Sequence, residues 1–177
     1  DLYKLNFYRA FSKLNCETSH IDFFSRTEEL EEKILSQDIV YVGGGNTKSM
    51  LAVWRDWNLN LILKKAYDNG IVMSGVSAGA ICWFEKGITD SYAKSLEILN
   101  CLGFVKGIAC PHFDEEKERE PYVNDLIKRD LISSCICIEG YSALHITKNG
   151  FKTINFGDNK QCFKLYKENN KILKKII

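Results

Sequence analysis

The stretch IVMSGVSAGAICWF, residues 71–84, places one serine between two glycines at the end of an apolar run. Residues 71–74 predict a buried β-strand, and residues 78–84 predict the start of a helix. Gly75-Val-Ser-Ala-Gly79 fits G-x-S-x-G, the pattern of a nucleophile elbow, in which a sharp strand-to-helix turn lifts a serine Oγ out of the sheet. The alternative is a turn of small residues that only packs a helix close to a strand.

Strand-like and helix-like segments alternate through the rest of the sequence. Strands are predicted at 20–24, 38–42, 71–74, 108–111, 135–138, 143–147, 152–156 and 163–166, and helices at 2–14, 28–36, 48–54, 59–69, 78–84 and 117–130. Because several strands are continuous apolar runs, we expect an α/β fold, three-layer α/β/α with a mostly parallel sheet. No linker or internal repeat is visible, so residues 1–177 are predicted to form a single domain.

The composition limits the kinds of partner. The net charge is +1, so neither nucleic acid nor an anionic membrane is expected as a partner. No apolar run reaches the roughly 18 residues that a membrane span needs, and no secretory signal is visible. The chain begins with DLYKLNFYRAF, without a methionine and already helix-like, which is consistent with a processed chain or a fragment.

Seven cysteines raise the questions of disulfides and of metal binding. Their number is odd, no C-x-x-C pair occurs, and several lie in apolar segments, which favours buried free thiols in a reducing compartment. We therefore expect a cytoplasmic location, no metal site and no cofactor.

A serine hydroxyl is a poor nucleophile without a base. Among the three histidines, His112 follows an apolar strand and Pro111, at the carboxyl end where open α/β sheets gather their chemistry. His20 and His145 lie within or beside strand patterns and are interpreted as structural. His112 is therefore the predicted base, with a surface-loop histidine as the alternative.

A third group should hold the imidazole in its productive tautomer. Glu139 is modestly favoured, because it also directly follows a strand. The other candidates are Asp90, Glu97, Asp114 and Glu115. The last two are expected to be too near His112 in sequence to reach the far side of its ring, and the pattern alone leaves the choice open.

The turn Gly43-Gly-Gly-Asn46 ends another apolar strand. It lacks the G-K-[ST] ending of a P-loop and the spacing of a dinucleotide site. Beside a serine nucleophile, a glycine-rich turn can instead bring a backbone N–H to a developing oxyanion. The N–H of Ala78, at the start of the predicted helix, is a second natural oxyanion donor.

Three segments, YVGGGNTKSML, GVSAGAICW and CPHFDEE, followed by IEGYSAL, together resemble the peptidase E family of serine peptidases, the aspartyl dipeptidases. The resemblance covers nearly the whole chain and implies a fold like the class I glutamine amidotransferase domain. It implies that Ser77 is the nucleophile, His112 the base and Glu139 the third member, with Gly45 and Ala78 as oxyanion donors. The family normally begins with one or two strands before the helix that opens this chain, and they are not recognisable here.

The resemblance also implies a substrate. The family member best known for this chemistry removes an N-terminal aspartate from short peptides, and an arginine downstream of the histidine pairs with the aspartate side chain. Arg119 lies at about the matching place, so we expect it, together with Asn46 of the glycine turn, to bind substrate. Arginine suits this role because its planar fork binds carboxylates bidentately. A solvated helix residue is the alternative for Arg119.

These inferences predict a serine exopeptidase that hydrolyses short peptides, Asp-X dipeptides above all, through an acyl-enzyme. The expected partner is a small peptide, and a homodimer is left open. One alternative is a hydrolase of the same family acting on isoaspartyl or cyanophycin-type substrates; another is a catalytically inactive member. A glutamine amidotransferase is disfavoured because its nucleophile is cysteine, and Cys82 lies one turn beyond the elbow.

Overall fold

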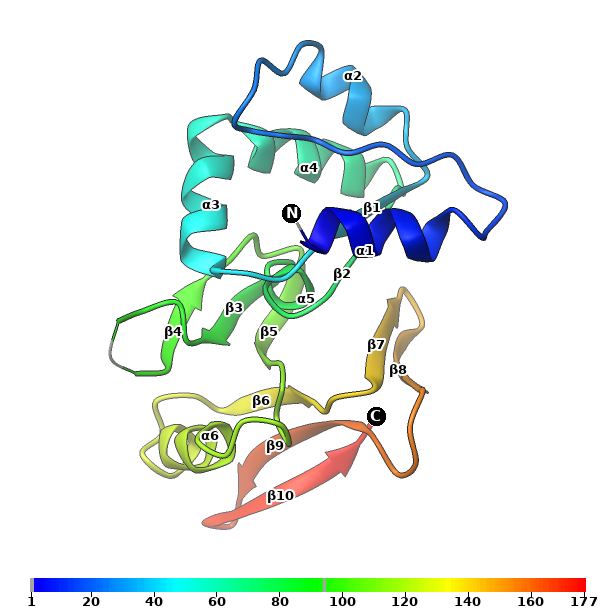
Figure 1. Ribbon diagram of the computed structural model, residues 1–177. Coiled ribbons are helices and arrows are strands. Elements are labelled where there is room, and N and C mark those ends of the chain that lie inside the picture. Colours follow the sequence, from blue (N-terminus) through cyan, green and yellow to red (C-terminus); the bar gives the residue numbers. More distant parts are fainter. Residues whose placement is uncertain (1, 94) are drawn as a thin grey trace.

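A computed structural model describes residues 2–93 and 95–177 of the chain (Figure 1). The helices are α1 (Leu2–Phe11), α2 (Leu30–Leu35), α3 (Thr47–Asp56), α4 (Leu59–Asp68), α5 (Ala78–Ile81) and α6 (Arg119–Lys128). The strands are β1 (Ile39–Val42), β2 (Val72–Gly75), β3 (Phe84–Thr89), β4 (Glu97–Asn100), β5 (Val105–Cys110), β6 (Ser134–Ile138), β7 (Ser142–Thr147), β8 (Gly150–Asn155), β9 (Cys162–Glu168) and β10 (Lys171–Ile176).

The strands form one large sheet and two strand pairs. The large sheet has the order β10-β9-β6-β5-β3-β4, with parallel neighbours at its centre (β3–β5 and β5–β6) and antiparallel strands toward both edges. β1 and β2 pair in parallel, and β7 and β8 form an antiparallel hairpin. The protein thus has a mixed α/β fold, in which antiparallel strands extend the parallel core that the sequence predicts.

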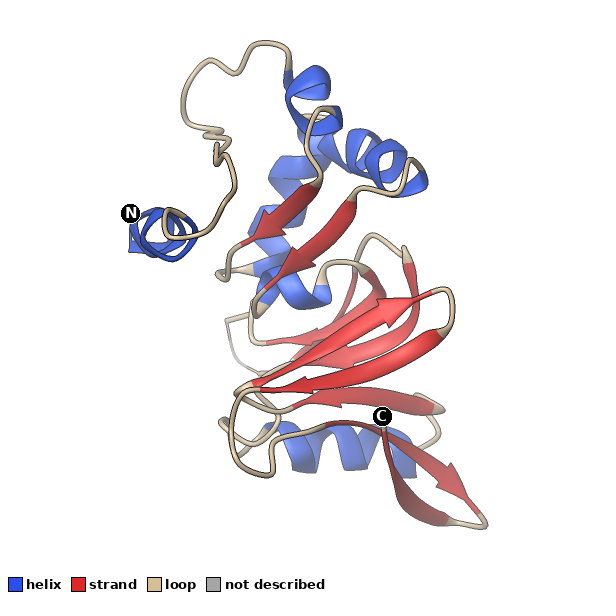
Figure 2. Cartoon of the chain, turned by 90° about the vertical axis from the view of Figure 1, so that its right-hand side faces the viewer, coloured by secondary structure: helices blue, strands red, loops and turns tan. Residues whose placement is uncertain are grey.

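The six-stranded sheet packs on α6 (Figure 2). Val123 and Ile127 of α6 are fully buried against Cys135 and Cys137 of β6 and Phe163 of β9. Burying one such aliphatic side chain stabilises the fold by roughly 1.5–3 kcal/mol. This core fixes β5 and β6, whose carboxyl ends carry the candidate site residues that follow them.

A second core lies between β1–β2 and helices α3 and α4. Leu51 of α3 and Leu63 of α4 are almost completely buried there, and Val40 and Met73 of the two strands pack against the same cluster. Apolar residues three or four apart on these helices face the strands, as the predicted helical pattern requires. This core fixes β1 and β2, and β2 leads directly into Ser77.

Helix α1 lies on the other side of the β1–β2 pair, away from α3 and α4 (Figure 2). Its Phe7 and Phe11 rings approach Tyr41 of β1, with centroids at 5.7 and 5.9 Å. Ile39 and Val72 on these strands remain 58% and 55% exposed. Within the described residues β1 and β2 pair only with each other, at the place where the peptidase E resemblance leads us to expect further strands.

Several predicted elements differ from the structure. Residues 20–24 form no strand, and the helix predicted at 78–84 ends at Ile81 because Phe84 begins β3. β3 and β4 were not predicted from their mixed sequences, and they form because Gly87 and Ile88 are buried in pairing with β4 and β5. The C-terminal residues form β10, which pairs with β9.

Candidate active site

Ser77 lies in the sharp turn between β2 and α5, with φ 56° and ψ −114°. These dihedral angles are outside the regions that non-glycine residues commonly occupy, and such strain persists only where the surrounding structure enforces it. The prediction of a strained strand-to-helix turn with serine at its apex is confirmed. Ser77 is half-buried and follows the carboxyl end of β2.

The two glycines of the elbow are explained by the approach of β1. A Cβ on Gly79 would stand 2.1 Å from the carbonyl oxygen of Val42, and a Cβ on Gly75 would stand 2.5 Å from the same oxygen. That oxygen also accepts a hydrogen bond from the Val76 N–H at 3.1 Å. The small residues therefore let the end of β1 hold the turn that presents Ser77.

His112 follows β5 and Pro111 and contacts Ser77 directly. Its Nε2 lies 2.8 Å from Ser77 Oγ, within hydrogen-bond distance. Its φ is 52°, so it too has left-handed backbone geometry, which turns the chain sharply at the end of the strand. The two residues predicted as nucleophile and base thus meet, although 35 positions separate them in the sequence.

Glu115 is the carboxylate that contacts the other ring nitrogen. Its Oε2 lies 2.6 Å from His112 Nδ1. The chain turns at His112, whose carbonyl accepts hydrogen bonds from the N–H groups of Glu115 and Glu116, both at 3.1 Å. This turn brings the Glu115 carboxylate back to the imidazole of His112. The sequence analysis had expected Glu115 to be too near His112 in the chain to make this contact.

Gly140 provides the space for this carboxylate. A Cβ at Gly140 would stand 2.6 Å from both Cδ and Oε1 of Glu115. The signal that could have identified Glu115 is the spacing His-x-x-Glu in a turn, together with a glycine on the loop that faces it.

Glu139 is not the group that contacts His112 in this structure, which corrects the expectation for the third member. Its carboxylate accepts a hydrogen bond from the Gln161 N–H at 2.9 Å, and its own N–H donates to the Gln161 carbonyl at 3.2 Å. Glu139 thus ties the end of β6 to the loop before β9. Among the described residues, no hydrogen bond joins it to His112.

Lys160 lies among the three carboxylates beside the site. It forms an ion pair with Asp114, and this bond together with the charges of Asp114, Glu139 and Glu115 raises the pKa of its ammonium group. Partial burial alone would raise the pKa of Asp114, but hydrogen bonds from Lys160 and the Gly140 N–H outweigh it and lower that pKa. Lys160 therefore offsets part of the negative charge next to His112.

The expected oxyanion donors, Ala78 and Gly45, lie in the turn after Ser77 and in the glycine turn that follows β1. Ala78 is the first residue of α5, where a helix supplies no internal acceptor for its N–H groups. Gly45 has φ 137°, a conformation open to glycine, and a Cβ there would meet nothing within 4 Å. A Cβ on the neighbouring Gly44 would stand 3.3 Å from Ser77 Cβ, so the glycine turn borders the nucleophile.

Comparison with known proteins shows the family of this chain. The model of Peptidase family S51 matches residues 1–154. The chain is 43% identical over 155 residues to "Uncharacterized peptidase YgaJ" of Bacillus subtilis (strain 168), covering 86% of this chain and 67% of that protein. The chain belongs to peptidase family S51.

The family S51 chain also resembles a solved structure. It superimposes on a 1.5 Å crystal structure of a "Putative Peptidase E Protein" from Listeria monocytogenes EGD-e with a TM-score of 0.67. The match covers 84% of this chain and 75% of the other at 18% identity. The resemblance to the peptidase E family and the α/β fold inferred from it are thereby confirmed.

Arg119 occupies a different place from the one expected of a substrate-binding residue. Its side chain is 2% exposed, Nε donates to Glu116 Oε2 at 2.7 Å, and Nη1 donates to the Ile88 carbonyl at 3.1 Å. A buried guanidinium must satisfy its donors internally. Arg119 thus joins α6 to β3 in this family S51 structure and presents no free face to a substrate.

Asn46 is likewise used by the fold. Its Oδ1 accepts a hydrogen bond from the Ser49 N–H at 2.9 Å, which caps α3, and its Nδ2 donates to the Ser91 carbonyl at 3.1 Å. Both ends of the amide are therefore committed. The side chain holds the glycine turn in place rather than projecting toward a substrate.

The cysteines of this family S51 chain include no second nucleophile at the elbow. Cys82 is completely buried, and burial raises the pKa of its thiol. Burial also raises the pKa of Cys101 to about 11 and that of Cys110 to about 12. All seven thiols are free. Within the described residues, no three or more His, Cys, Asp or Glu side chains lie together in a way that could hold a metal ion.

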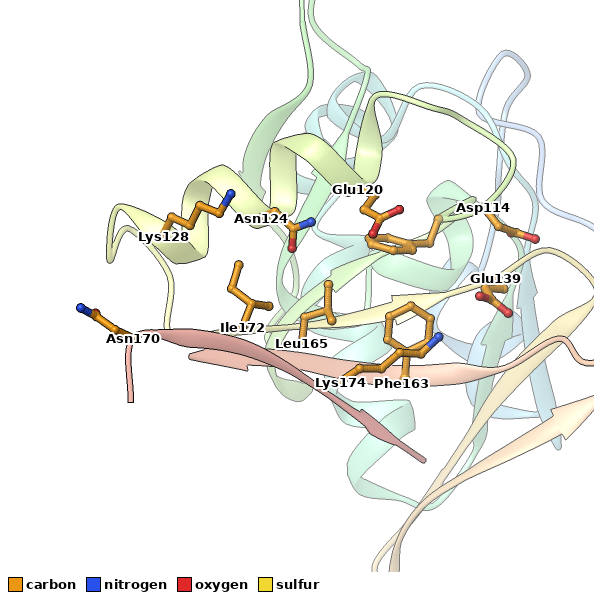
Figure 3. A pocket seen from close by; sticks show the side chains of 11 residues that line it. Asp114, Glu120, Asn124, Lys128, Glu139, Phe163, Leu165, Asn170, Ile172 and Lys174 are labelled. Atoms are coloured by element: carbon orange, nitrogen blue, oxygen red, sulfur yellow. The ribbon is translucent and has the colours of Figure 1, made fainter. Parts of the chain in front are cut away.

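An open pocket of about 500 Å³ lies between α6 and the β9–β10 hairpin (Figure 3). Phe113, Phe163, Leu165 and Ile172 contribute apolar surface to it. Asp114 and Glu139 lie at one end of the pocket, and Lys128 and Asn170 lie at the other end (Figure 3). Ser77 and His112 do not line this pocket.

No helix in the described part of the chain is long and apolar enough to cross a membrane.

Proposed function

We propose that this chain is a serine exopeptidase that hydrolyses short peptides through an acyl-enzyme on Ser77. The observation that carries the proposal is the 2.8 Å contact between Ser77 Oγ and His112 Nε2 at a strained elbow. Nucleophilic catalysis requires a hydroxyl within hydrogen-bond reach of a base. Membership of peptidase family S51 supports the same chemistry.

The reaction follows from the positions of these groups. His112 Nε2 takes the Oγ proton as Ser77 attacks the first peptide carbonyl, and the resulting oxyanion lies near the N–H groups of Gly45 and Ala78. His112 then gives the proton to the leaving amine as the C–N bond breaks. Water then gives one proton to the same nitrogen as it attacks the ester carbonyl, and His112 passes that proton to Ser77 Oγ as the C–Oγ bond breaks and the acid leaves.

We assign the orienting carboxylate to Glu115. Its contact with Nδ1 keeps the proton on that nitrogen and leaves Nε2 free to accept from Ser77. Glu139, which the family resemblance favours, instead ties two loops together. Glutamine substitutions at the two positions distinguish the assignments, as set out in the Discussion.

The substrate class is proposed from the family resemblance together with the open site. An N-terminal aspartate is the first candidate, with isoaspartyl and cyanophycin-type substrates as the alternatives. Because Arg119 is buried and already paired, it is not part of this proposal. The preference for an N-terminal aspartate is therefore to be tested by activity measurements.

The experiment compares hydrolysis of Asp-Leu, Ala-Leu and isoaspartyl-Leu by the wild-type protein and by Ser77→Ala. We expect cleavage of Asp-Leu and a loss of about 10⁶-fold in the variant, because serine peptidases lose nearly all catalysis without the nucleophile. Cleavage of only isoaspartyl-Leu would replace the substrate while retaining the mechanism. A folded wild-type protein that cleaves none of the three would contradict the exopeptidase proposal.

A further inference from the structure

Lys160, in the loop before β9, is joined to the turn that carries the proposed base. Asp114 lies in that turn, between His112 and Glu115. Asp114 Oδ1 accepts a hydrogen bond from the Gly140 N–H at 2.8 Å, and its other carboxylate oxygen forms an ion pair with Lys160 Nζ. Because Glu115 contacts the His112 ring at 2.6 Å, the Asp114 carboxylate fastens the same short turn that holds both partners.

The surroundings of Lys160 keep its ammonium group at this place. Its own N–H donates to the Gly157 carbonyl at 3.3 Å. The next residue, Gln161, exchanges hydrogen bonds with Glu139 at 2.9 and 3.2 Å. The Lys160 side chain is 36% exposed and that of Asp114 is 23% exposed, so water screens this pair less than it screens a pair on an open surface.

Charged groups from three segments gather in this part of the site. They are Asp114, Glu115 and Glu116 of the His112 turn, Glu139 after β6, and Lys160 before β9. Glu116 is paired with Arg119, and the nucleophile elbow contributes the neutral hydroxyl of Ser77. The hydrogen bond with Asp114 and the charges of the nearby carboxylates raise the pKa of Lys160, so its ammonium group stays charged at neutral pH.

A cation among carboxylates changes the balance between the two forms of a nearby imidazole. Negative charge beside the ring favours the imidazolium form, and positive charge favours the neutral form. His112 Nε2 can accept the proton of Ser77 Oγ only when the ring is neutral. Glu115 orients the ring but also favours the imidazolium form before the reaction begins, and a nearby cation offsets that effect.

We propose that Lys160 is a positioning residue of the active site, whose ammonium group, held by Asp114, keeps His112 in the neutral form that accepts the Ser77 proton. Lys160 acts through His112 rather than on the substrate. The inference rests on the proposed reaction at Ser77 and gives a role to a residue outside the sequence motifs. Removing the charge of Lys160 should move the acid limb of the pH–rate profile to higher pH.

The test compares variants that differ in charge at one place. Lys160→Met and Lys160→Gln remove the charge, and Lys160→Arg keeps it. The double variant Asp114→Asn/Lys160→Met removes both charges of the pair, while asparagine keeps an acceptor for the Gly140 N–H. Lys167→Met is the matched control, because Lys167 lies near the other end of β9 and forms an ion pair with Asp130 at 2.8 Å.

Two measurements are made on each variant between about pH 5 and pH 9. NMR follows the titration of the three histidine rings, and the His112 signal is identified by its loss in His112→Ala. The rate at which a fluorophosphonate labels Ser77 gives the acid limb of the reaction without any peptide substrate. Circular dichroism checks that each variant is folded.

In Lys160→Met and Lys160→Gln, we expect the His112 ring to titrate at a pH about half a unit higher than in the wild-type protein, because one partly screened positive charge is lost. Labelling of Ser77 near pH 6 should then be about threefold slower and should approach the wild-type rate near pH 9. Lys160→Arg and Lys167→Met should behave as the wild-type protein, and the double variant should return toward it.

Three results would overturn the inference. One is an unchanged titration of His112 in both neutral variants of Lys160, and another is an equal shift in Lys167→Met. The third is labelling that is slower at every pH while His112 titrates as in the wild-type protein, which would leave Lys160 only a structural role. If the wild-type protein cleaves no peptide, the exopeptidase proposal fails, and the titration of His112 still decides the role of Lys160.

Discussion

The two residues of the proposed catalytic pair come from differently supported parts of the molecule. Ser77 follows β2 of the two-stranded pair, where Ile39 and Val72 are more than half exposed. His112 follows β5, at the centre of the six-stranded sheet, where Ala109 and Cys110 are completely buried. The nucleophile therefore depends on a less enclosed strand pair than the base does.

The difference shows that close backbone packing can position a group where side-chain burial is incomplete. The elbow is held by the contact of Gly75 and Gly79 with the end of β1, and by the core under α3 and α4. The His112 turn combines its backbone hydrogen bonds with side-chain contacts through Glu115, Asp114 and Lys160. Changes to backbone contacts should thus affect the first region most, and changes to charge the second.

The largest expected effect is at Gly79. Gly79→Ala places a methyl group into the Val42 backbone, which neither strand can easily avoid, and should lower the free energy of unfolding by about 3 kcal/mol. Gly43→Ala is the control, because its Cβ would make only an ordinary 3.5 Å contact. Urea unfolding measures both. Equal stability of the two variants would contradict the backbone explanation of the elbow.

The next effect separates the two glutamates. Glu115→Gln should lower kcat/KM by about 10²-fold, because the neutral amide no longer holds His112 in its productive tautomer; exposure of the Glu115 side chain to water keeps the loss below that of a buried acid. Glu139→Gln should change kcat/KM by less than about threefold, because the amide oxygen of a glutamine can accept the hydrogen bond from the Gln161 N–H as the carboxylate does. The reverse order of the two losses would return the role to Glu139.

Cysteine reactivity compares the two cores directly. Cys101 borders the core under α3 and α4 and is half-buried, whereas Cys110 is the last residue of β5 and is completely buried. Burial raises the pKa of both thiols, to about 11 and about 12. With iodoacetamide at neutral pH, we expect the exposed Cys16 to react first, Cys101 later and Cys110 last. Mass spectrometry of digests gives the order, and reaction of Cys110 before Cys101 would show that the central sheet opens more readily.

The smallest effect concerns the charge of Asp114. Its pKa is lowered in the folded protein, so the stability it contributes is present above the unfolded pKa and is lost as pH falls through the folded one. Asp114→Asn should therefore be slightly less stable than the wild-type protein at pH 7, and the difference should shrink as the pH falls from 7 through the folded pKa. Thermal unfolding across this range checks the sign. A difference that grows toward low pH would contradict it.

Much of the site follows from local sequence patterns. The elbow at Ser77 and the position of His112 at a strand end are encoded within a few residues, and the structure brings the two together. The choice of Glu115 depends on the turn at His112 and on the space left by Gly140, a loop far away in the sequence. That long-range fit cannot be read from spacing.

The fold shows the same limit. Strands with continuous apolar runs, such as β1 and β6, are predicted, whereas β3 and β4 contain charged and small residues and form through pairing with their neighbours. Arg119 was expected to bind substrate, with a solvated helix residue as the alternative, yet its guanidinium group contacts the Ile88 carbonyl and Glu116 inside the protein. Tertiary hydrogen bonds decide its position, and the local sequence does not report them.

The most direct test of the central claim is mass spectrometry of the protein after reaction with a fluorophosphonate. An activated serine forms a covalent adduct, whereas an ordinary hydroxyl does not react appreciably. We predict one adduct, located on Ser77, that is absent in Ser77→Ala and forms far more slowly in His112→Ala. A folded wild-type protein that remains unmodified, or that is modified at another residue, would contradict the assignment of Ser77 and His112 as nucleophile and base.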